Sequence, residues 1–200
     1  MKTITRVYDS YNQARQAVAD LENEGVRPAD INLIANKYVC EETEGLDSGG
    51  ATAPSAGVGA ALGGTAGLLA GLGILAIPGL GPVIAAGALA ATAVGAAAGA
   101  LGGGVIGALV SAGVAEPEAH VYCEAVRRGG TMVSARVHND NAEHLAEVMS
   151  HHHPIDASSR FADYHREGWT KFDPGAEPYV PSRAEVDRMR EPYSWEKPLG

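Results

Sequence analysis

Cysteines and basic residues are scarce in this chain, and both shortages restrict its function. The two cysteines among 200 residues, Cys40 and Cys123, are too few for a disulfide scaffold. Fifteen Lys and Arg stand against 24 Asp and Glu, so the net charge of -9 argues against nucleic acid as a partner. The first six residues lack the apolar core of a secretory signal peptide, so we expect a cytoplasmic N-terminus.

Charged residues are missing altogether from Ser48 to Ala115, and we name this segment the uncharged stretch. It divides the chain into four parts. Residues 1–47 are expected to form a first βαβ unit and an acidic linker, and 48–115 an Ala/Gly-rich hairpin. Residues 116–157 are expected to form a helix and a second βαβ unit, and 158–200 an aromatic, proline-containing tail.

Glycines recur at four-residue intervals in the uncharged stretch, and residues four apart share one face of a helix. Such a stripe of small residues lets another helix approach closely, as in a glycine zipper. Prolines and glycines at 77–82 separate two runs of this kind, which predicts a helical hairpin with arms over 57–76 and 83–112. The glycines expected to mediate self-association are Gly59, Gly63, Gly67, Gly71, Gly87, Gly95, Gly99, Gly103 and Gly107.

Strand and helix signals on both sides of the uncharged stretch repeat each other. β-Branched or alternating apolar residues predict strands near 3–8, 31–35 and 131–137. Capping-box patterns predict helices after Ser10 and after Asp140, and Glu116-Pro117-Glu118 begins another helix. With a closing strand near 154–157, the order becomes βαββαβ. This predicts an α+β, ferredoxin-like domain with the hairpin and the Glu116 helix inserted between its second and third strands.

Aromatic residues accumulate in the tail without helical or strand periodicity for most of its length. Because aromatics at this density are rarely left in solvent, we expect an extended segment that wraps its own domain or a neighbouring subunit. A disordered tail is the alternative.

Candidate chemistry is limited to histidines. His151, His152 and His153 are consecutive, and His144 lies two turns earlier on the same helix face, so these four are weak candidates for metal ligands. No cysteine or carboxylate completes a known metal-site spacing, and no lysine follows the glycines as a phosphate loop requires. We therefore expect no enzyme, no cofactor and no resident metal, with a histidine-based metal-binding protein as the second alternative function.

The setting of the hairpin stays open between lipid and protein. As helices its arms would span about 30 and 45 Å, which is enough to cross a bilayer core. However, the flanks are acidic and lack the basic and aromatic residues that border membrane spans. In water each glycine costs a helix up to ~1 kcal/mol relative to alanine, so the hairpin needs close packing, for instance among copies of itself. Membrane insertion, a soluble homo-oligomeric particle or filament, and a surface-adsorbed form are all compatible with the residues.

Several motifs resemble a known family of small bacterial proteins. They are the opening strand-helix-strand, the hairpin around Ile77-Pro78-Gly79-Leu80-Gly81-Pro82, and Ala119-His120-Val121-Tyr122 leading to Arg128-Gly129-Gly130-Thr131. Over residues 1 to about 157 the chain resembles the general-stress-protein (heat-induced stress protein) family, whose members are usually described as stress-related or predicted membrane proteins. The resemblance implies no catalytic residues. We expect a non-enzymatic, stress-associated protein that self-associates in or at the cytoplasmic membrane or in the cytoplasm, with itself and membrane lipid as partners.

Overall fold

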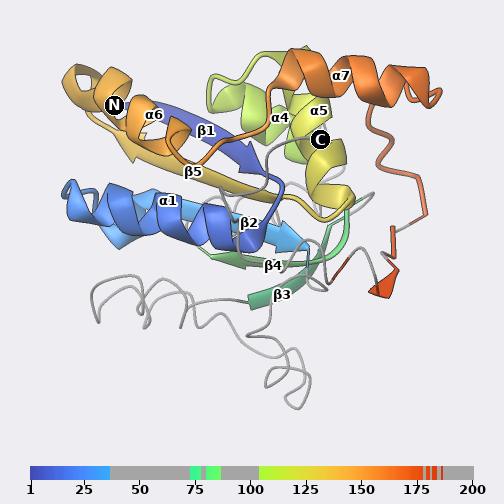
Figure 1. Cartoon of the computed structure of the whole chain (residues 1–200), viewed down its shortest axis with the longest axis horizontal. Coiled ribbons are helices and arrows are strands. Elements are labelled where there is room, and N and C mark those ends of the chain that lie inside the picture. The colour runs from blue at the N-terminus through green and yellow to red at the C-terminus, as the bar shows by residue number, and fades with distance from the viewer. Residues whose placement is uncertain are drawn as a thin grey trace, which may run out of the picture.

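The computed structural model describes residues 1–36, 73–77, 80–86, 104–177, 179–180, 182–183 and 186 (Figure 1). Within these residues the fold is mixed α+β, with a 5-stranded antiparallel sheet in the order β1-β5-β2-β4-β3. The strands are β1 (Lys2–Tyr8), β2 (Ile31–Asn36), β3 (Gly73–Ile77), β4 (Gly81–Ala86) and β5 (Thr131–Val137). The α-helices are α1 (Tyr11–Asn23), α4 (Gly104–Ser111), α5 (Glu116–Arg127), α6 (Ala142–Ser150) and α7 (Ala157–Arg166). Two 3-10 turns are η1 (Pro28–Asp30) and η5 (Asn139–Asn141).

Strand β5 lies between β1 and β2 and is antiparallel to both. Ile4 of β1 and Ile31 of β2 stand opposite the same residue of β5, Ala135. Strands β1 and β2 are therefore parallel to each other, and α1 connects them. The predicted first βαβ unit is confirmed, with a strand from the second half of the chain inserted into it.

Helix α1 begins with the predicted capping box. The Gln13 backbone N–H donates to the Ser10 hydroxyl oxygen at 3.2 Å, and the Ser10 N–H donates to the Gln13 side-chain oxygen at 3.2 Å. This reciprocal pair satisfies backbone donors that the first turn leaves without helical partners. The second predicted box is wrong, because Asp140 belongs to η5 and the N-cap of α6, Asn141, makes no side-chain capping bond.

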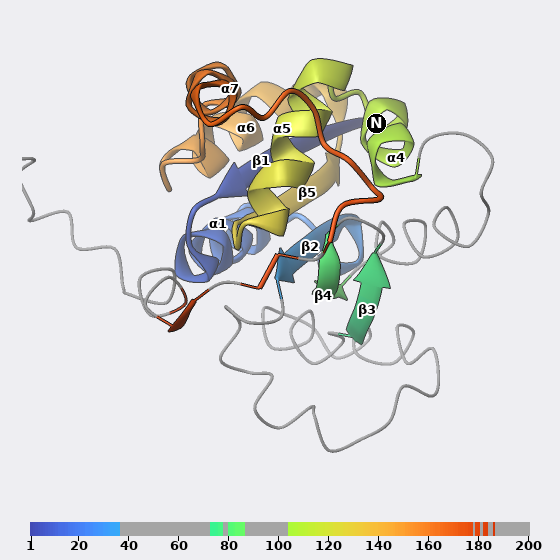
Figure 2. The same cartoon turned by 90° about the vertical axis from the view of Figure 1, so that its right-hand side faces the viewer.

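Helices cover both faces of the sheet, and each face forms its own core (Figures 1 and 2). The first core joins α1 and α6 to alternate residues of the strands, including Ile4, Leu33, Val133, Ala135 and Val137. The second core joins α4 and α5 to the other face of the sheet, including Val7, Ile34, Val83 and Met132, and it also contains Phe172 of the tail. All six residues of β2 are consequently buried.

The predicted helical hairpin is wrong around its turn, where the structure has two strands in place of the ends of the two helices. Within the uncharged stretch, β3 and β4 pair antiparallel with Ile77 opposite Gly81, and β4 continues the sheet by pairing Ile84 with Ala35 of β2. The free edge of β2 offers backbone partners to a segment rich in β-branched residues, and this long-range pairing overrides the glycine period. Helix α4 does lie within the second predicted arm. The other parts of the two arms lie outside the described residues.

After α6 the chain returns along the outer side of β1 without forming the predicted closing strand. One backbone bond joins the two segments, from the Ile155 N–H to the Val7 carbonyl at 2.8 Å. Helix α7 then begins at Ala157, capped by Asp156, whose Oδ1 accepts a hydrogen bond from the Ser159 N–H at 2.7 Å.

The first part of the tail is thus a helix and not the extended segment that we expected. Beyond it, Phe172 is buried in the second core and Trp169 packs against that core. The described beginning of the tail therefore lies on its own domain.

Candidate functional site

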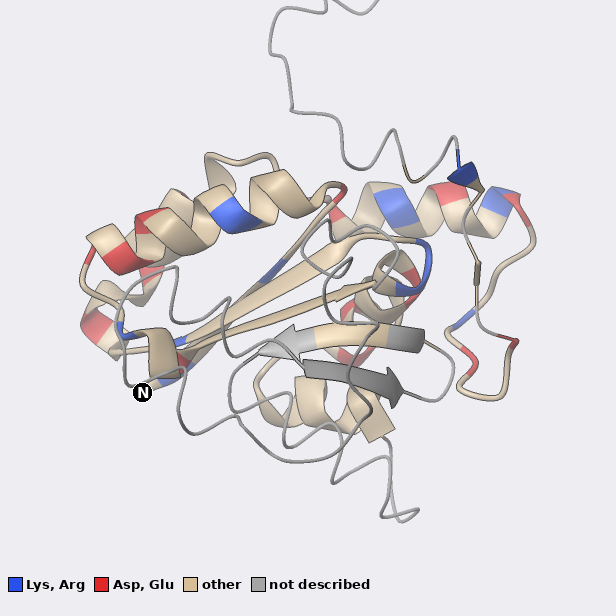
Figure 3. Cartoon of the chain, turned by 90° about the horizontal axis from the view of Figure 1, so that it is seen from below, with Lys and Arg blue, Asp and Glu red and all other residues tan. Residues whose placement is uncertain are grey.

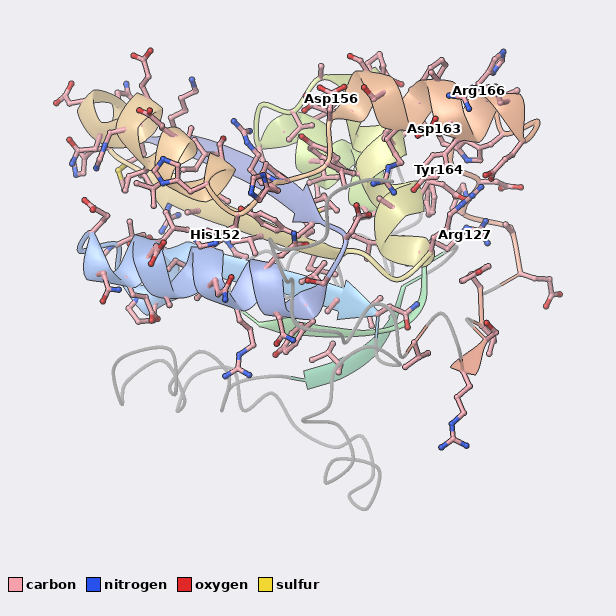
Figure 4. All side chains as sticks on the ribbon, viewed as in Figure 1. Arg127, His152, Asp156, Asp163, Tyr164 and Arg166 are labelled. Atoms are coloured by element: carbon pink, nitrogen blue, oxygen red, sulfur yellow. The ribbon has the colours of Figure 1, made fainter. Side chains whose placement is uncertain are left out.

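A groove of about 740 Å³ opens beside β1, where the segment after α6 passes the beginnings of α5 and α7. Three parts of the chain that are distant in sequence form its walls: β1, the beginning of α5, and the continuous segment from the end of α6 into α7. Figure 4 labels Asp156 at the beginning of α7, on one wall. The lining residues are Arg6, Ala115, Pro117, Glu118, Val121, Tyr122, Pro154, Ile155, Asp156, Ala157, Ser158 and Phe161.

Two helix N-termini border the groove, and they differ in how they are capped. Helix α7 is capped by Asp156, and hydrogen bonds from Ser159 lower the pKa of this carboxyl group. The N-cap of α5 is Ala115, which has no side chain that could accept a bond, and Pro117 occupies the first turn. The acidic residues Glu116 and Glu118 complement the positive end of the α5 dipole instead.

Arg6 supplies the positive charge of the groove. Its guanidinium donates from NH1 to the Thr5 carbonyl at 2.9 Å, and no carboxylate in the described part of the chain forms an ion pair with it. Thr5-Arg6-Val7 and Ala135-Arg136-Val137 form a repeated sequence motif, because each lies near the end of a strand that is followed by a helix. Arg136 of β5 occupies the place of Arg6 in this motif, yet it is bound to buried Asp30, NH2 to Oδ1, at 2.8 Å. The two related arginines therefore differ, because Arg136 forms an ion pair within the fold whereas Arg6 has no ion-pair partner among the described residues.

Glu118 and Tyr122 form the polar part of the opposite wall. The Tyr122 hydroxyl donates to Glu118 Oε1 at 2.5 Å. Burial raises the pKa of Tyr122, and the Glu118 bond raises it further, while Arg6 lowers it and Asp156 raises it. The groove thus presents one guanidinium, two carboxylates and a protonated phenol, between apolar side chains. The described lining residues include neither histidine nor cysteine. The combination of a few charged groups with an apolar lining is suited to binding.

A cluster of five side chains, which we name the α7 clamp, holds α7 against α5. Its members are Glu124, Arg127, Arg128, Tyr164 and Glu167. Buried Glu124 Oε1 accepts bonds from Arg127 NH2 and Arg128 Nε, both at 2.7 Å. The Arg128 guanidinium lies 4.2 Å from the centre of the Tyr164 ring and donates to Glu167 at 2.6 Å. Figure 4 labels Tyr164 and Arg127 in this region. The clamp fixes the helix that forms one wall of the groove.

The histidines considered as metal ligands lie apart from the groove. His144 and His152 contact carboxylates at the C-terminal end of α1. His144 Nε2 lies 3.1 Å from Oε2 of the C-cap residue Glu24, and His152 Nε2 lies 2.8 Å from Asp20 Oδ2. His151 and His153 are exposed. No group of three or more His, Cys, Asp or Glu suited to holding a metal ion occurs in the part of the chain that is described.

The predicted self-association residues are mostly outside the described ranges. Gly107 lies in α4 and is half-buried, and the other eight glycines are among residues that the structure does not describe. Cys123 lies in the second core, where burial raises the pKa of its thiol; Cys40 is outside the described residues. Among the described helices, none is long and apolar enough to cross a membrane.

No protein-family model, characterised protein or solved structure matches this chain. The sequence patterns do not predict the charged residues of the groove as a site. The one local signal is Arg6, a charged residue in the middle of a strand whose counterpart in the second half is bound to Asp30.

Proposed function

We propose that this protein is a non-enzymatic, stress-associated protein that associates with copies of itself through the uncharged stretch. The observation that carries this proposal is the far edge of the sheet. Strands β4 and β3 come from that stretch, and β3 is the last strand in the order. Among the described strands only β4 pairs with β3, so one side of β3 has no strand partner within this part of the chain.

An edge strand of this composition favours pairing with another chain. Proteins commonly protect such edges with charged residues or prolines, and β3 reads Gly-Ile-Leu-Ala-Ile without either. Helix α4 likewise carries no charge, whereas charged residues are frequent on α1, α6 and α7 (Figure 3). We therefore assign association to the edge formed by β3 (Gly73–Ile77), which we name the uncharged edge.

We further propose that the domain is a variant of the ferredoxin-like arrangement. The order β1-β5-β2, with α1 and α6 on one face, supports this proposal. The variant has the segment around Ile155 in place of a fourth strand, and the β4-β3 hairpin extends the opposite side. The relationship to the general-stress-protein family is part of the same proposal and depends on the motifs quoted above.

The soluble homo-oligomer is the second candidate setting, beside a membrane-bound one. It is favoured because β3, β4 and α4 belong to the sheet and the second core of the domain. Those segments are then unavailable to a transmembrane hairpin, and each predicted arm becomes shorter.

Fractionation and mass measurement test the proposal on the full chain. Cells are lysed without detergent, the lysate is centrifuged at high speed, and the recovered protein is measured by light scattering after sizing. We expect a multimer, in the soluble fraction for the second candidate setting and in the membrane fraction for the first. A monomer at tens of micromolar, recovered without detergent, overturns self-association.

Matched variants test the assigned surface. Ala76→Lys adds a charge to β3, and Ala162→Lys adds the same charge to an exposed position of α7. We expect the first variant to reduce the multimer mass and the second to leave it unchanged. Gly67→Leu and Gly99→Leu test the glycine stripe in the same assay. Equal masses for all four variants and the parent protein contradict association through the uncharged stretch.

A further inference from the structure

We propose that the groove beside β1 binds a small zwitterion, namely an amino acid or short peptide with a free ammonium group, a free carboxylate and an apolar side chain. This proposal is independent of self-association, because the groove lies at β1 and the uncharged edge lies at β3, the opposite ends of the sheet order. Three properties of the groove lead to it: an available cation, available carboxylate oxygens and an apolar lining.

The cation is Arg6. One of its terminal nitrogens donates to the Thr5 carbonyl, and no ion pair with a described residue occupies the rest of the guanidinium. A partly buried arginine of this kind has several free donors in a planar fork, which matches the two oxygens of a carboxylate. The equivalent Arg136 already binds a carboxylate, since its Nε and NH2 both donate to Asp30 Oδ1. Arg6 is therefore the group expected to receive the carboxylate of the ligand.

The ammonium group is expected at Glu118, with Asp156 nearby. Glu118 accepts the Tyr122 hydroxyl through Oε1, and its second oxygen has no partner among the described residues. Asp156 uses one oxygen to cap α7. Both Arg6 and Asp156 act on the pKa of Tyr122, in opposite directions, so charges of both signs lie within electrostatic range of one hydroxyl. A ligand with both charges is complementary to such a groove.

The remaining lining is apolar and has room for a side chain. Val121 and Ile155 are buried, Pro117 lies in the first turn of α5, and Phe161 is 41% exposed; all four line the groove. Ligand sites commonly combine a mostly apolar lining with a few well-placed polar groups. A volume of about 740 Å³ is within the usual range for small ligands and is large enough for a dipeptide.

The charge balance separates this class from other ligands. With one guanidinium and two carboxylates, the groove has an excess of negative charge, which disfavours nucleotides and other polyphosphates. An apolar cation without a carboxylate would leave Arg6 unpaired while excluding water from it, which costs binding energy. A zwitterion is the ligand class that places an opposite charge beside both the guanidinium and the carboxylates of the groove.

Calorimetric titration of the full chain with Leu-Phe dipeptide, its N-acetyl derivative and its C-terminal amide tests the proposal. We expect the unblocked dipeptide to bind and each blocked form to bind about tenfold more weakly or worse, because each loses one charge-assisted contact. Inorganic phosphate is expected not to compete. No binding of the dipeptide at 10 mM, equal binding of all three peptides, or competition by phosphate overturns the proposal.

Two variants assign the ends of the ligand. Arg6→Gln should remove the preference for the free acid over the amide, and Glu118→Gln should remove the preference for the free amine over the acetylated peptide. Arg6→Lys keeps the charge and should retain part of the acid preference, which separates a lost contact from a folding defect. Arg166→Gln, at an exposed arginine outside the groove lining, is the control and should bind like the parent protein. Equal effects of Arg6→Gln and Arg166→Gln contradict the assignment.

Discussion

Replacing Glu124 with glutamine should weaken the fold by removing the centre of the α7 clamp. The Glu124 side chain is 2% exposed and accepts three bonds, two from Arg127 at 2.7 and 2.9 Å and one from Arg128 at 2.7 Å. Glutamine has nearly the same shape but carries no charge. Its amide nitrogen cannot accept a bond, so at least one arginine N–H loses its partner.

The magnitude follows from the burial of the groups. A hydrogen bond to a charged group contributes roughly 1.5–3 kcal/mol, and breaking a fully buried ion pair costs about 3–5 kcal/mol. Arg127 and Arg128 are 18% and 28% exposed, so both can regain some hydration in the variant. We therefore expect Glu124→Gln to lower the free energy of unfolding by about 2–3 kcal/mol.

Urea unfolding at pH 7, followed by circular dichroism, measures this loss. With a slope of about 2 kcal/mol per molar urea, the midpoint should fall by roughly 1–1.5 M with an unchanged slope. Asp163→Asn is the matched control, because it removes a carboxylate from an ion pair with Arg166 whose side chains are 53% and 75% exposed. Such a pair contributes less than about 1 kcal/mol. Indistinguishable midpoints for the two variants would refute the assigned role of the clamp.

Three further variants test the core and its buried polar groups. Burial opposes ionisation of Asp30, but bonds from two arginines hold its pKa below the usual value. Its ionised form therefore stabilises the fold above the unfolded-state pKa of about 3.9, and acid titration of Asp30→Asn should show a loss of about 1–3 kcal/mol at pH 7 that disappears as the pH falls below 4. Gly130→Ala would place a Cβ 2.9 Å from the carbonyl oxygen of Ala125, so thermal unfolding should show a loss of about 1–3 kcal/mol. Tyr8→Phe removes a hydrogen bond of 2.9 Å to the Met149 carbonyl of α6, so urea unfolding should show a free energy of unfolding lower by about 1 kcal/mol. An unchanged stability of Gly130→Ala or of Tyr8→Phe contradicts the packing described.

Elements with complete local signals could be predicted from the sequence. The capping box at Ser10, the apolar spacing of α1, the proline in the first turn of α5 and the alternation in β5 each involve residues close together in the chain. Short-range patterns of this kind determine an element almost independently of its partners. The described bounds of these elements accordingly lie within one or two residues of those expected.

Elements that depend on distant partners could not be predicted in this way. The glycine spacing in the uncharged stretch favours helix locally, whereas Gly73–Ile77 and Gly81–Ala86 become strands because β2 has a free edge. The groove was missed for the same reason, since β1, α5, the segment after α6 and α7 contribute to it together. The groove can bind a carboxylate only if Arg6 has no ion-pair partner, and no sequence pattern predicts whether an arginine is paired in the fold.

The position of β5 in the sheet has a consequence during synthesis. The two neighbours of β5 in the sheet are β1 and β2, and both are synthesised before it. The entire uncharged stretch is made after β2 and before β5. At about 5–20 residues per second, this interval lasts roughly 5–20 seconds. Throughout it, β1 and β2 lack their shared partner, and an apolar segment of the nascent chain has no finished domain to join. Assistance from a chaperone during translation is therefore expected to affect the yield of this protein more than its final stability.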